Sequence, residues 1–250
     1  MDLSEFYRYS GGKTVSAKFH MRCRYCFYAD EAACRQEGMW GIMSRETARA
    51  AIRRALAHAE GSCTFMFQGG EPTLAGLDFF RFFADTVRQE NRRGVQISYA
   101  FQTNGLALDA QWAEFLARNQ VLVGISMDGT AQVHDALRPA ADGSGTHSTV
   151  MENLQMLRRA GVECNVLAVV TRQLARSINQ TYDFFPSRAY STSSTSPVWT
   201  RWRRPGADAN ILFPRRSTPS FFTGCSAAGR RIWTAENMCR FAILITGSAF

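Results

Sequence analysis

The chain has 250 residues, 46% of them hydrophobic and 20% charged, which is typical of a globular protein with one large domain or a domain and an appendage. No apolar run approaches the roughly 20 residues of a transmembrane helix, and residues 1–12 hold no hydrophobic stretch of the signal-peptide type, so we expect neither a membrane span nor a secretory signal. Seven cysteines at irregular spacing do not indicate a disulfide framework and favour a cytoplasmic protein.

The formal net charge of +8 lies almost entirely at one end of the chain. Residues 186–250 contain nine arginines against Asp208 and Glu236, whereas residues 1–185 are close to neutral. A basic tail on a neutral body is typical of a nucleic-acid-binding arm, and this hypothesis predicts salt-dependent binding that is lost with the tail.

From about residue 15 to residue 185 the sequence alternates short β-type runs with amphipathic helical stretches. Ser44 and Asp109 stand where helices should start, and Gly61, Gly94 and Gly161 stand where they should stop. Repeated βα units predict an α/β fold with a parallel sheet, either doubly wound or barrel-like. The expected strands cover residues 15–18, 63–67, 95–101, 121–126 and 162–170, and the expected helices cover residues 44–59, 77–90, 109–118 and 148–160.

Polar clusters follow three of the expected strands, and a cysteine segment at residues 19–28 follows the first. Taken singly, Gly69-Gly70 can be interpreted as a turn, Ser126 as the end of a strand and Arg138 as a surface charge. Functional groups of parallel α/β folds lie at the carboxyl ends of the strands. The joint placement of the clusters at 68–72, 102–105 and 126–129 therefore predicts one site at this rim.

Cys23 and Cys26 form a CxxC pair that is followed by two aromatic residues. This spacing occurs in zinc half-sites and in redox pairs. Neither a second CxxC nor a His pair completes a zinc site, and Arg24-Tyr25 is unusual between redox cysteines. From the spacing alone, a metal site and incidental cysteines both stay open.

Longer segments are more specific. They are CRYCFY at 23–28, FQGGEPTLAGLDFF at 67–80, FQTNG at 101–105, LVGISMDG at 122–129 and VHDALR at 133–138. Over about residues 13–185 the chain resembles the anaerobic sulfatase-maturating enzymes, a branch of the radical S-adenosylmethionine (SAM) superfamily. The resemblance implies a partial (β/α) radical SAM barrel with a [4Fe-4S] cluster and SAM. It also implies oxidation of a sulfatase Cys or Ser to Cα-formylglycine through a 5′-deoxyadenosyl radical.

The same resemblance implies site residues and partners. Cys23 and Cys26 match two of the three cluster ligands, and Gly69 and Glu71 belong to the loop that shapes the pocket. The expected partners are an unfolded or nascent sulfatase polypeptide and an electron donor such as flavodoxin or ferredoxin, with neither nucleic acid nor membrane. The positions that match SAM contacts of the family are Tyr25, Gly70, Ser126 and Arg138.

The first departure from the family is Phe19, which stands where the first cluster cysteine is expected. Three thiolates hold three irons of the cube, and phenylalanine cannot ligate iron. The neighbouring His20 is expected to point elsewhere, and Cys34 would need its loop to fold back. We therefore expect a cluster that is bound weakly or not at all.

The second departure begins after about residue 185, where the βα rhythm stops. Codons for residues 193–201, regrouped one nucleotide earlier, allow QYIPCLDPL, and those for residues 236–248 allow EYVSIRYFDNW. Both strings resemble family segments in the expected order, and the second holds an aspartate that resembles the family's proposed catalytic base. We expect residues 1–185 to be a radical SAM core with an incomplete C-terminal end, and residues 186–250 to be an out-of-frame tail without evolved function.

The favoured hypothesis is a radical SAM enzyme that is impaired or inactive with this sequence, with no catalytic residue assigned. The alternatives are another radical SAM peptide-modifying enzyme and a non-catalytic remnant that still binds SAM or a peptide. The sequence does not distinguish a Cys-type from a Ser-type sulfatase target.

Overall fold

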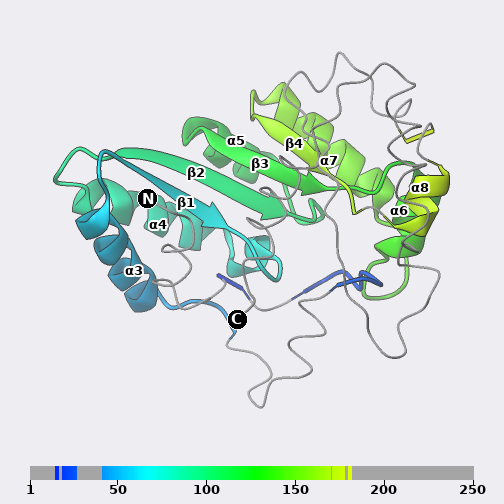
Figure 1. The fold of residues 1–250 in the computed structure, drawn as a ribbon, viewed down its shortest axis with the longest axis horizontal. Coiled ribbons are helices and arrows are strands. Elements are labelled where there is room, and N and C mark those ends of the chain that lie inside the picture. The colour runs from blue at the N-terminus through cyan, green and yellow to red at the C-terminus, as the bar shows by residue number, and fades with distance from the viewer. Residues whose placement is uncertain (1–14, 17–18, 27–40, 170, 178–179, 182–250) are drawn as a thin grey trace. The chain divides into compact units, whose positions relative to one another are not determined.

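The computed structural model describes residues 15–16, 19–26, 41–169, 171–177 and 180–181. They form an α/β fold around a four-stranded sheet with the order β1-β2-β3-β4 (Figure 1). β1 pairs with β2, and β2 with β3, in parallel. The predicted α/β architecture with a parallel sheet is therefore confirmed. The strands are β1 (Ser62–Phe67), β2 (Gln96–Thr103), β3 (Val121–Ser126) and β4 (Cys164–Leu167).

Helices alternate with these strands, as the sequence predicts. α4 and β3 have the predicted bounds, and α3 and α5 each begin one residue after the predicted cap. Among the described residues, none of the helices has the length and apolar character of a membrane span. The helical elements are α3 (Arg45–His58), η1 (Pro72–Ala75), α4 (Leu77–Glu90), α5 (Ala110–Arg118), α6 (Ala131–Leu137), α7 (His147–Arg159) and α8 (Arg172–Arg176).

Side-chain caps start two of the predicted helices. Ser44 Oγ accepts a hydrogen bond from the backbone N of Thr47 at 3.1 Å before α3. Asp109 Oδ1 accepts one from the backbone N of Trp112 at 2.9 Å before α5. Each bond satisfies a backbone N–H that has no partner within its own helix. After α3, Gly61 adopts φ of 87°, a left-handed conformation that side chains disfavour.

The structure divides into two compact units. Among the described residues, the first unit holds residues 15–16, 19–21, 26, 41–125 and 149–164. The second holds residues 22–25, 126–148 and the described part of 165–181. β1, β2, α3, α4 and α5 therefore belong to the first unit, and α6 and α8 to the second.

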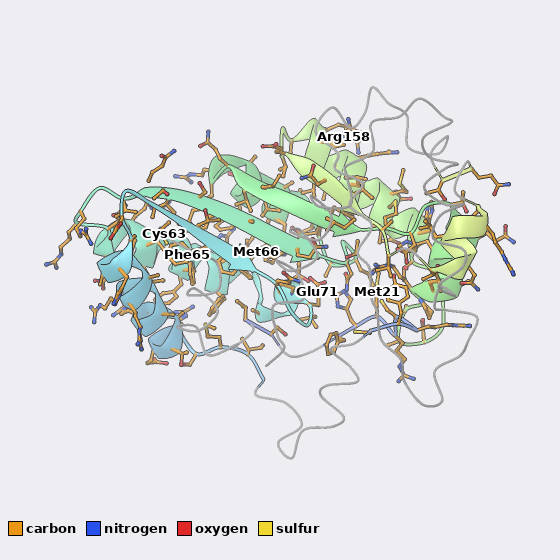
Figure 2. All side chains as sticks on the ribbon, in the orientation of Figure 1. Met21, Cys63, Phe65, Met66, Glu71 and Arg158 are labelled. Carbon is orange, nitrogen blue, oxygen red and sulfur yellow. The ribbon has the colours of Figure 1, made fainter. Side chains whose placement is uncertain are left out.

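In the first unit, β1 buries one face against aromatic side chains of α4. Burial alternates along the strand, and Cys63, Phe65 and Phe67 are the buried residues. Figure 2 labels Cys63 and Phe65 on this strand. The ring of Phe67 lies edge-on to those of Phe80 and Phe83, with 4.9 Å between centroids in each pair. Burial of each such ring contributes about 1.5–3 kcal/mol. This aromatic layer fixes β1 and so the start of the loop that follows it.

The structure differs from the predictions mainly in short elements. η1, α6 and α8 are not among the predicted helices, because four to seven residues show too little of a 3.6-residue period. The strand predicted at 162–170 is limited to Cys164–Leu167. Of the strand predicted at 15–18, Ser16 forms an antiparallel bridge with Ile42. Residues 17–18, Cys34 and the predicted tail at 186–250 lie outside the described residues.

Candidate functional site

Asp128 follows β3 and is fully buried in the second unit. Its Oδ2 accepts hydrogen bonds from the Tyr25 hydroxyl and from Arg138 Nε, the latter at 2.9 Å. Its Oδ1 accepts a hydrogen bond from the backbone N of Val169 at 2.9 Å and lies 3.5 Å from Arg138 Nη2. A buried charge requires an opposite charge and satisfied hydrogen bonds. The carboxylate and the guanidinium supply this to each other.

Arg138 stands at the C-terminal end of α6 and is 6% exposed. Its guanidinium carbon lies 5.1 Å from the centroid of the Tyr25 ring, a cation–π contact. Its Nη1 lies 3.9 Å from Cys23 Sγ. The same helix end holds the cysteine segment, because the backbone N of Arg24 donates to the carbonyl of Leu137 at 2.9 Å. Three predicted site residues, Cys23, Tyr25 and Arg138, are thus brought together.

The charge states of these groups follow from their surroundings. Burial raises the pKa of Tyr25 well above its usual value; Arg138 opposes this shift and Asp128 adds to it. The phenol therefore stays protonated at neutral pH, and its O–H donates a hydrogen bond to Asp128. Burial alone would lower the pKa of Arg138, but Asp128 and Tyr25 outweigh burial and raise it. The guanidinium is a permanent positive charge beside Cys23.

A buried histidine supports the backbone of both charged residues. His134 Nδ1 accepts a hydrogen bond from the backbone N of Asp128 at 3.3 Å, so Nε2 carries the proton. Nε2 donates to Thr146 Oγ1 at 3.0 Å, and the Thr146 hydroxyl donates to the carbonyl of Arg138 at 2.7 Å. Burial, with a further contribution from Arg138, lowers the pKa of His134 to about 4. The neutral imidazole therefore links the backbones of residues 128 and 138.

A second buried carboxylate, Glu71, joins the loops after β1 and β2 in the first unit (Figure 2). Its Oε1 accepts hydrogen bonds from the N and Oγ1 of Thr73, at 3.1 and 2.8 Å, and from Thr103 Oγ1 at 2.7 Å. Its Oε2 accepts one from the backbone N of Asn104 at 2.9 Å. Protein donors thus occupy both oxygens, and two of the predicted polar clusters meet as the sequence indicates.

The remaining predicted site residues have less specific surroundings. Gly69 and Gly70 adopt φ of 91° and 52°, so the bend after β1 depends on residues without a Cβ. Ser126 ends β3 and is half-buried, as is Cys26. Roles for these residues in binding SAM or a cluster stay predictions. The first unit holds Cys26, Gly69, Gly70 and Glu71, and the second holds Cys23, Tyr25, Ser126 and Arg138.

The thiols of the described residues do not fit a cluster held by three cysteines. Cys23 and Cys26 supply two sulfur atoms, and Phe19 at the third position offers no donor atom. In the described ranges, no three His, Cys, Asp or Glu side chains gather as a metal-binding group. Both ring nitrogens of His20 are buried without a hydrogen-bond partner among the described residues, but His20 is not part of any such group.

The second unit does hold a buried positive charge of the kind that an anionic ligand requires. A guanidinium has five N–H groups. Within the described residues, three of those on Arg138 are directed at Asp128 and Cys23. The two others belong to a buried, permanent cation, which is the preferred partner of a carboxylate.

Comparison with known proteins places the chain in a family. The model of the radical SAM superfamily matches residues 20–185. The chain belongs to the radical SAM superfamily. Within it, the chain is similar to the cysteine-type anaerobic sulfatase-maturating enzyme of Clostridium novyi (strain NT), with 40% identity over 178 residues, 71% of this chain and 48% of the relative. The serine-type enzyme of Bacteroides thetaiotaomicron is 32% identical over 174 residues, 69% of this chain and 42% of the relative. The chain spans about half the length of these relatives.

Solved structures agree with this grouping. Native anSMEcpe with bound AdoMet and Cp18Cys peptide has a TM-score of 0.74 and 32% identity, and the match covers 86% of this chain and 57% of that one. SuiB of Streptococcus suis has a TM-score of 0.57 at 15% identity and shares the fold alone. The predicted radical SAM fold and the resemblance to the sulfatase-maturating branch are confirmed.

Sequence reasoning does not single out Asp128, His134 or Thr146 as parts of the site. Asp128 is equally well explained as the end of a strand, and its bond to Tyr25 joins residues 103 positions apart. His134 carries a weak signal, because it lies between Val133 and Leu137 on the apolar side of VHDALR.

Proposed function

We propose that the chain is a SAM-binding radical SAM protein of the sulfatase-maturating type whose reaction is impaired by Phe19. The reaction of an intact ligand set would be oxidation of a Cys or Ser in an unfolded sulfatase polypeptide to Cα-formylglycine. A flavodoxin or ferredoxin would supply the electron for the reductive cleavage of SAM, and the substrate side chain would be oxidised by loss of hydrogen. The observation that carries the proposal is the assembly of Tyr25, Asp128 and Arg138 beside Cys23.

Each residue of this assembly has a proposed task in SAM binding. Arg138 pairs with the carboxylate of SAM through its two remaining N–H groups. Tyr25 holds the guanidinium in place by the contact of its ring and, through its hydroxyl, by the shared hydrogen bond to Asp128. Ser126 ends β3, and its hydroxyl suits a polar group in the remainder of the ligand.

In this proposal Phe19 prevents efficient turnover but does not prevent SAM binding. A SAM carboxylate needs the cation of Arg138, whereas a cluster needs a third thiolate that Phe19 cannot provide. We therefore expect SAM binding without efficient formation of 5′-deoxyadenosine under reducing conditions.

Anaerobic reconstitution of the protein and of its Phe19→Cys variant with iron and sulfide tests this. The expected result is an iron content far below one [4Fe-4S] cluster for the natural sequence and close to one cluster for Phe19→Cys. SAM binding by equilibrium dialysis and 5′-deoxyadenosine formation with dithionite are measured on both. Full iron content and 5′-deoxyadenosine from the natural sequence would show that Phe19 does not impair it. Absence of SAM binding in both proteins would refute the SAM-binding proposal.

A second candidate function is non-catalytic binding of SAM or of a sulfatase peptide, favoured by the two-thiol set alone. It predicts that the Phe19→Cys protein binds SAM and iron but still yields no 5′-deoxyadenosine. Formation of 5′-deoxyadenosine on restoring the cysteine, with oxidation of a sulfatase peptide detected by mass spectrometry, would favour the enzyme. Formation of 5′-deoxyadenosine without peptide oxidation would favour a related peptide-modifying enzyme with another target.

A further inference from the structure

We propose that Asp128 is a positioning residue that holds Arg138 and Tyr25 in the geometry required for SAM. The inference rests on the proposed function, since it deepens the description of the same site. Asp128 does not touch the ligand in this proposal; it acts through the two side chains that do.

Asp128 is hydrogen-bonded to both of the side chains that it is proposed to position. Its Oδ2 accepts from both the Tyr25 hydroxyl and Arg138 Nε, so one atom sets the distance between the two side chains. The guanidinium carbon lies 5.1 Å from the centroid of the Tyr25 ring in the resulting arrangement. Loss of the carboxylate therefore releases two groups of the site at once.

Asp128 also sets the orientation of the Arg138 guanidinium. Asp128 binds the guanidinium of Arg138 along its Nε side. Oδ2 accepts a hydrogen bond from Nε, and Oδ1 lies 3.5 Å from Nη2. In this arrangement Nη1 of Arg138 faces Cys23 and lies 3.9 Å from its Sγ. An arginine without this partner would be free to rotate about its long side chain, and the two N–H groups left for a ligand would have no fixed direction.

Two further hydrogen bonds hold Asp128 itself in place. Oδ1 accepts from the backbone N of Val169 at 2.9 Å, and the backbone N of Asp128 donates to His134 Nδ1 at 3.3 Å. The residue is 0% exposed. Its oxygens are taken by protein donors, so the carboxylate has no accessible lone pair with which to accept a substrate proton. This excludes a role as general base and leaves positioning.

Hydrogen exchange at the guanidinium tests the positioning directly and without SAM. The full chain is labelled with [15N]arginine, and the Nε–H signal of Arg138 is assigned by its loss in Arg138→Lys. We expect slow exchange in the natural protein and at least about tenfold faster exchange in Asp128→Asn, because a buried hydrogen bond is lost. Asp135→Asn is the matched control. Asp135 Oδ1 accepts from the backbone N of Thr146 and His147, both at 2.8 Å, and among the described residues none of its hydrogen bonds goes to the Arg138 guanidinium.

SAM affinity by equilibrium dialysis provides the second readout. Residues that orient the ligands of a metal ion typically affect affinity about 10-fold to 100-fold. By the same logic Asp128→Asn should weaken SAM binding by a factor of this order, and Asp135→Asn should not. Asp128→Glu keeps the charge and displaces the guanidinium by one methylene group. It should give intermediate values in both experiments, and it replaces Asp128→Asn if the latter does not fold.

The outcomes separate the two levels of the proposal. Natural-like exchange at Arg138 in both Asp128 variants would overturn the positioning role. Faster exchange with unchanged SAM affinity would overturn the link between this geometry and SAM. If the natural protein binds no SAM, the proposed function fails, and the exchange rates still decide whether Asp128 holds Arg138.

Discussion

Glu71 and Asp128 are both buried carboxylates at the carboxyl end of a strand, but their partners differ in charge. Within the described residues, Glu71 accepts hydrogen bonds only from neutral backbone and hydroxyl groups of two loops. Asp128 accepts from a guanidinium and a phenol that lie next to a cysteine. Burial alone therefore does not identify a functional carboxylate. The difference lies in whether the partners have donors left for a ligand, as Arg138 has.

The strongest test of this difference removes the cation. Arg138→Met leaves the Asp128 charge buried without compensation, and we expect a loss of about 3–5 kcal/mol in the free energy of unfolding. Urea denaturation followed by circular dichroism measures it. The double variant Asp128→Leu with Arg138→Met should recover much of the loss, because neither charge remains. A small effect of Arg138→Met alone would show that the pair is solvated.

Acid should weaken the second unit through His134. The pKa of His134 is about 4 in the folded protein because of burial and of Arg138, against about 6.5 in an unfolded chain. Between these values the unfolded chain binds a proton that the folded chain does not. The contribution of His134 is therefore complete above pH 6.5 and falls by about 1.4 kcal/mol for each pH unit below it.

The stability difference between the natural protein and His134→Asn, measured by urea denaturation from pH 7 to pH 4.5, should follow this dependence. His58→Asn is the control, since His58 is exposed on α3, where its Nδ1 lies 2.9 Å from the carbonyl of Arg54. A pH-independent difference for His134→Asn would mean that the imidazole is not held neutral.

Glu71→Gln should have a smaller effect than Arg138→Met, because no charge is left without a partner. The amide NH₂ introduced by this substitution would face donors that now bind a carboxylate oxygen, so at least one donor loses its acceptor. We expect a loss of about 1–3 kcal/mol. Unfolding by urea measures it, and an equal effect for Glu71→Gln and Arg138→Met would remove the distinction between the two carboxylates.

Two helix caps provide the smallest expected effects and a baseline for each unit. Asp109→Ala in the first unit and Asp135→Ala in the second each remove an acceptor for backbone N–H groups. Each should cost about 1 kcal/mol in thermal or urea unfolding. If the second cap costs several times more than the first, the site in the second unit depends on Asp135 as well as on Asp128.

The sequence predicts regular elements better than it predicts the site. The apolar spacing of residues 77–90 gives the bounds of α4, and the β-branched run at 121–126 gives those of β3. η1 begins directly after Glu71 and α6 ends directly before Arg138, but both are too short to show a period. The bond between Tyr25 and Asp128 joins residues from distant parts of the chain, and no local pattern contains that information.

The resemblance to a family and the structure contribute different parts of the site. The matching segments give Cys23, Tyr25 and Arg138 as site residues, and the structure shows them together. The resemblance gives no reason to select Asp128, because family matching identifies groups that touch a ligand. The residue that orients them becomes visible only when hydrogen-bond donors and acceptors are matched atom by atom.

The hydrogen bonds through His134 and Thr146 run in one direction, each group donating to the next. A threonine hydroxyl has one proton, so it can serve this sequence only if the imidazole donates to it. Replacement of Thr146 by valine would leave the Nε2–H of His134 and the carbonyl of Arg138 without partners simultaneously, whereas serine would keep both bonds. Apart from Thr146→Ser, positions 134 and 146 should therefore accept substitutions only as a pair, and a selection from randomised codons at both would recover linked changes rather than independent ones.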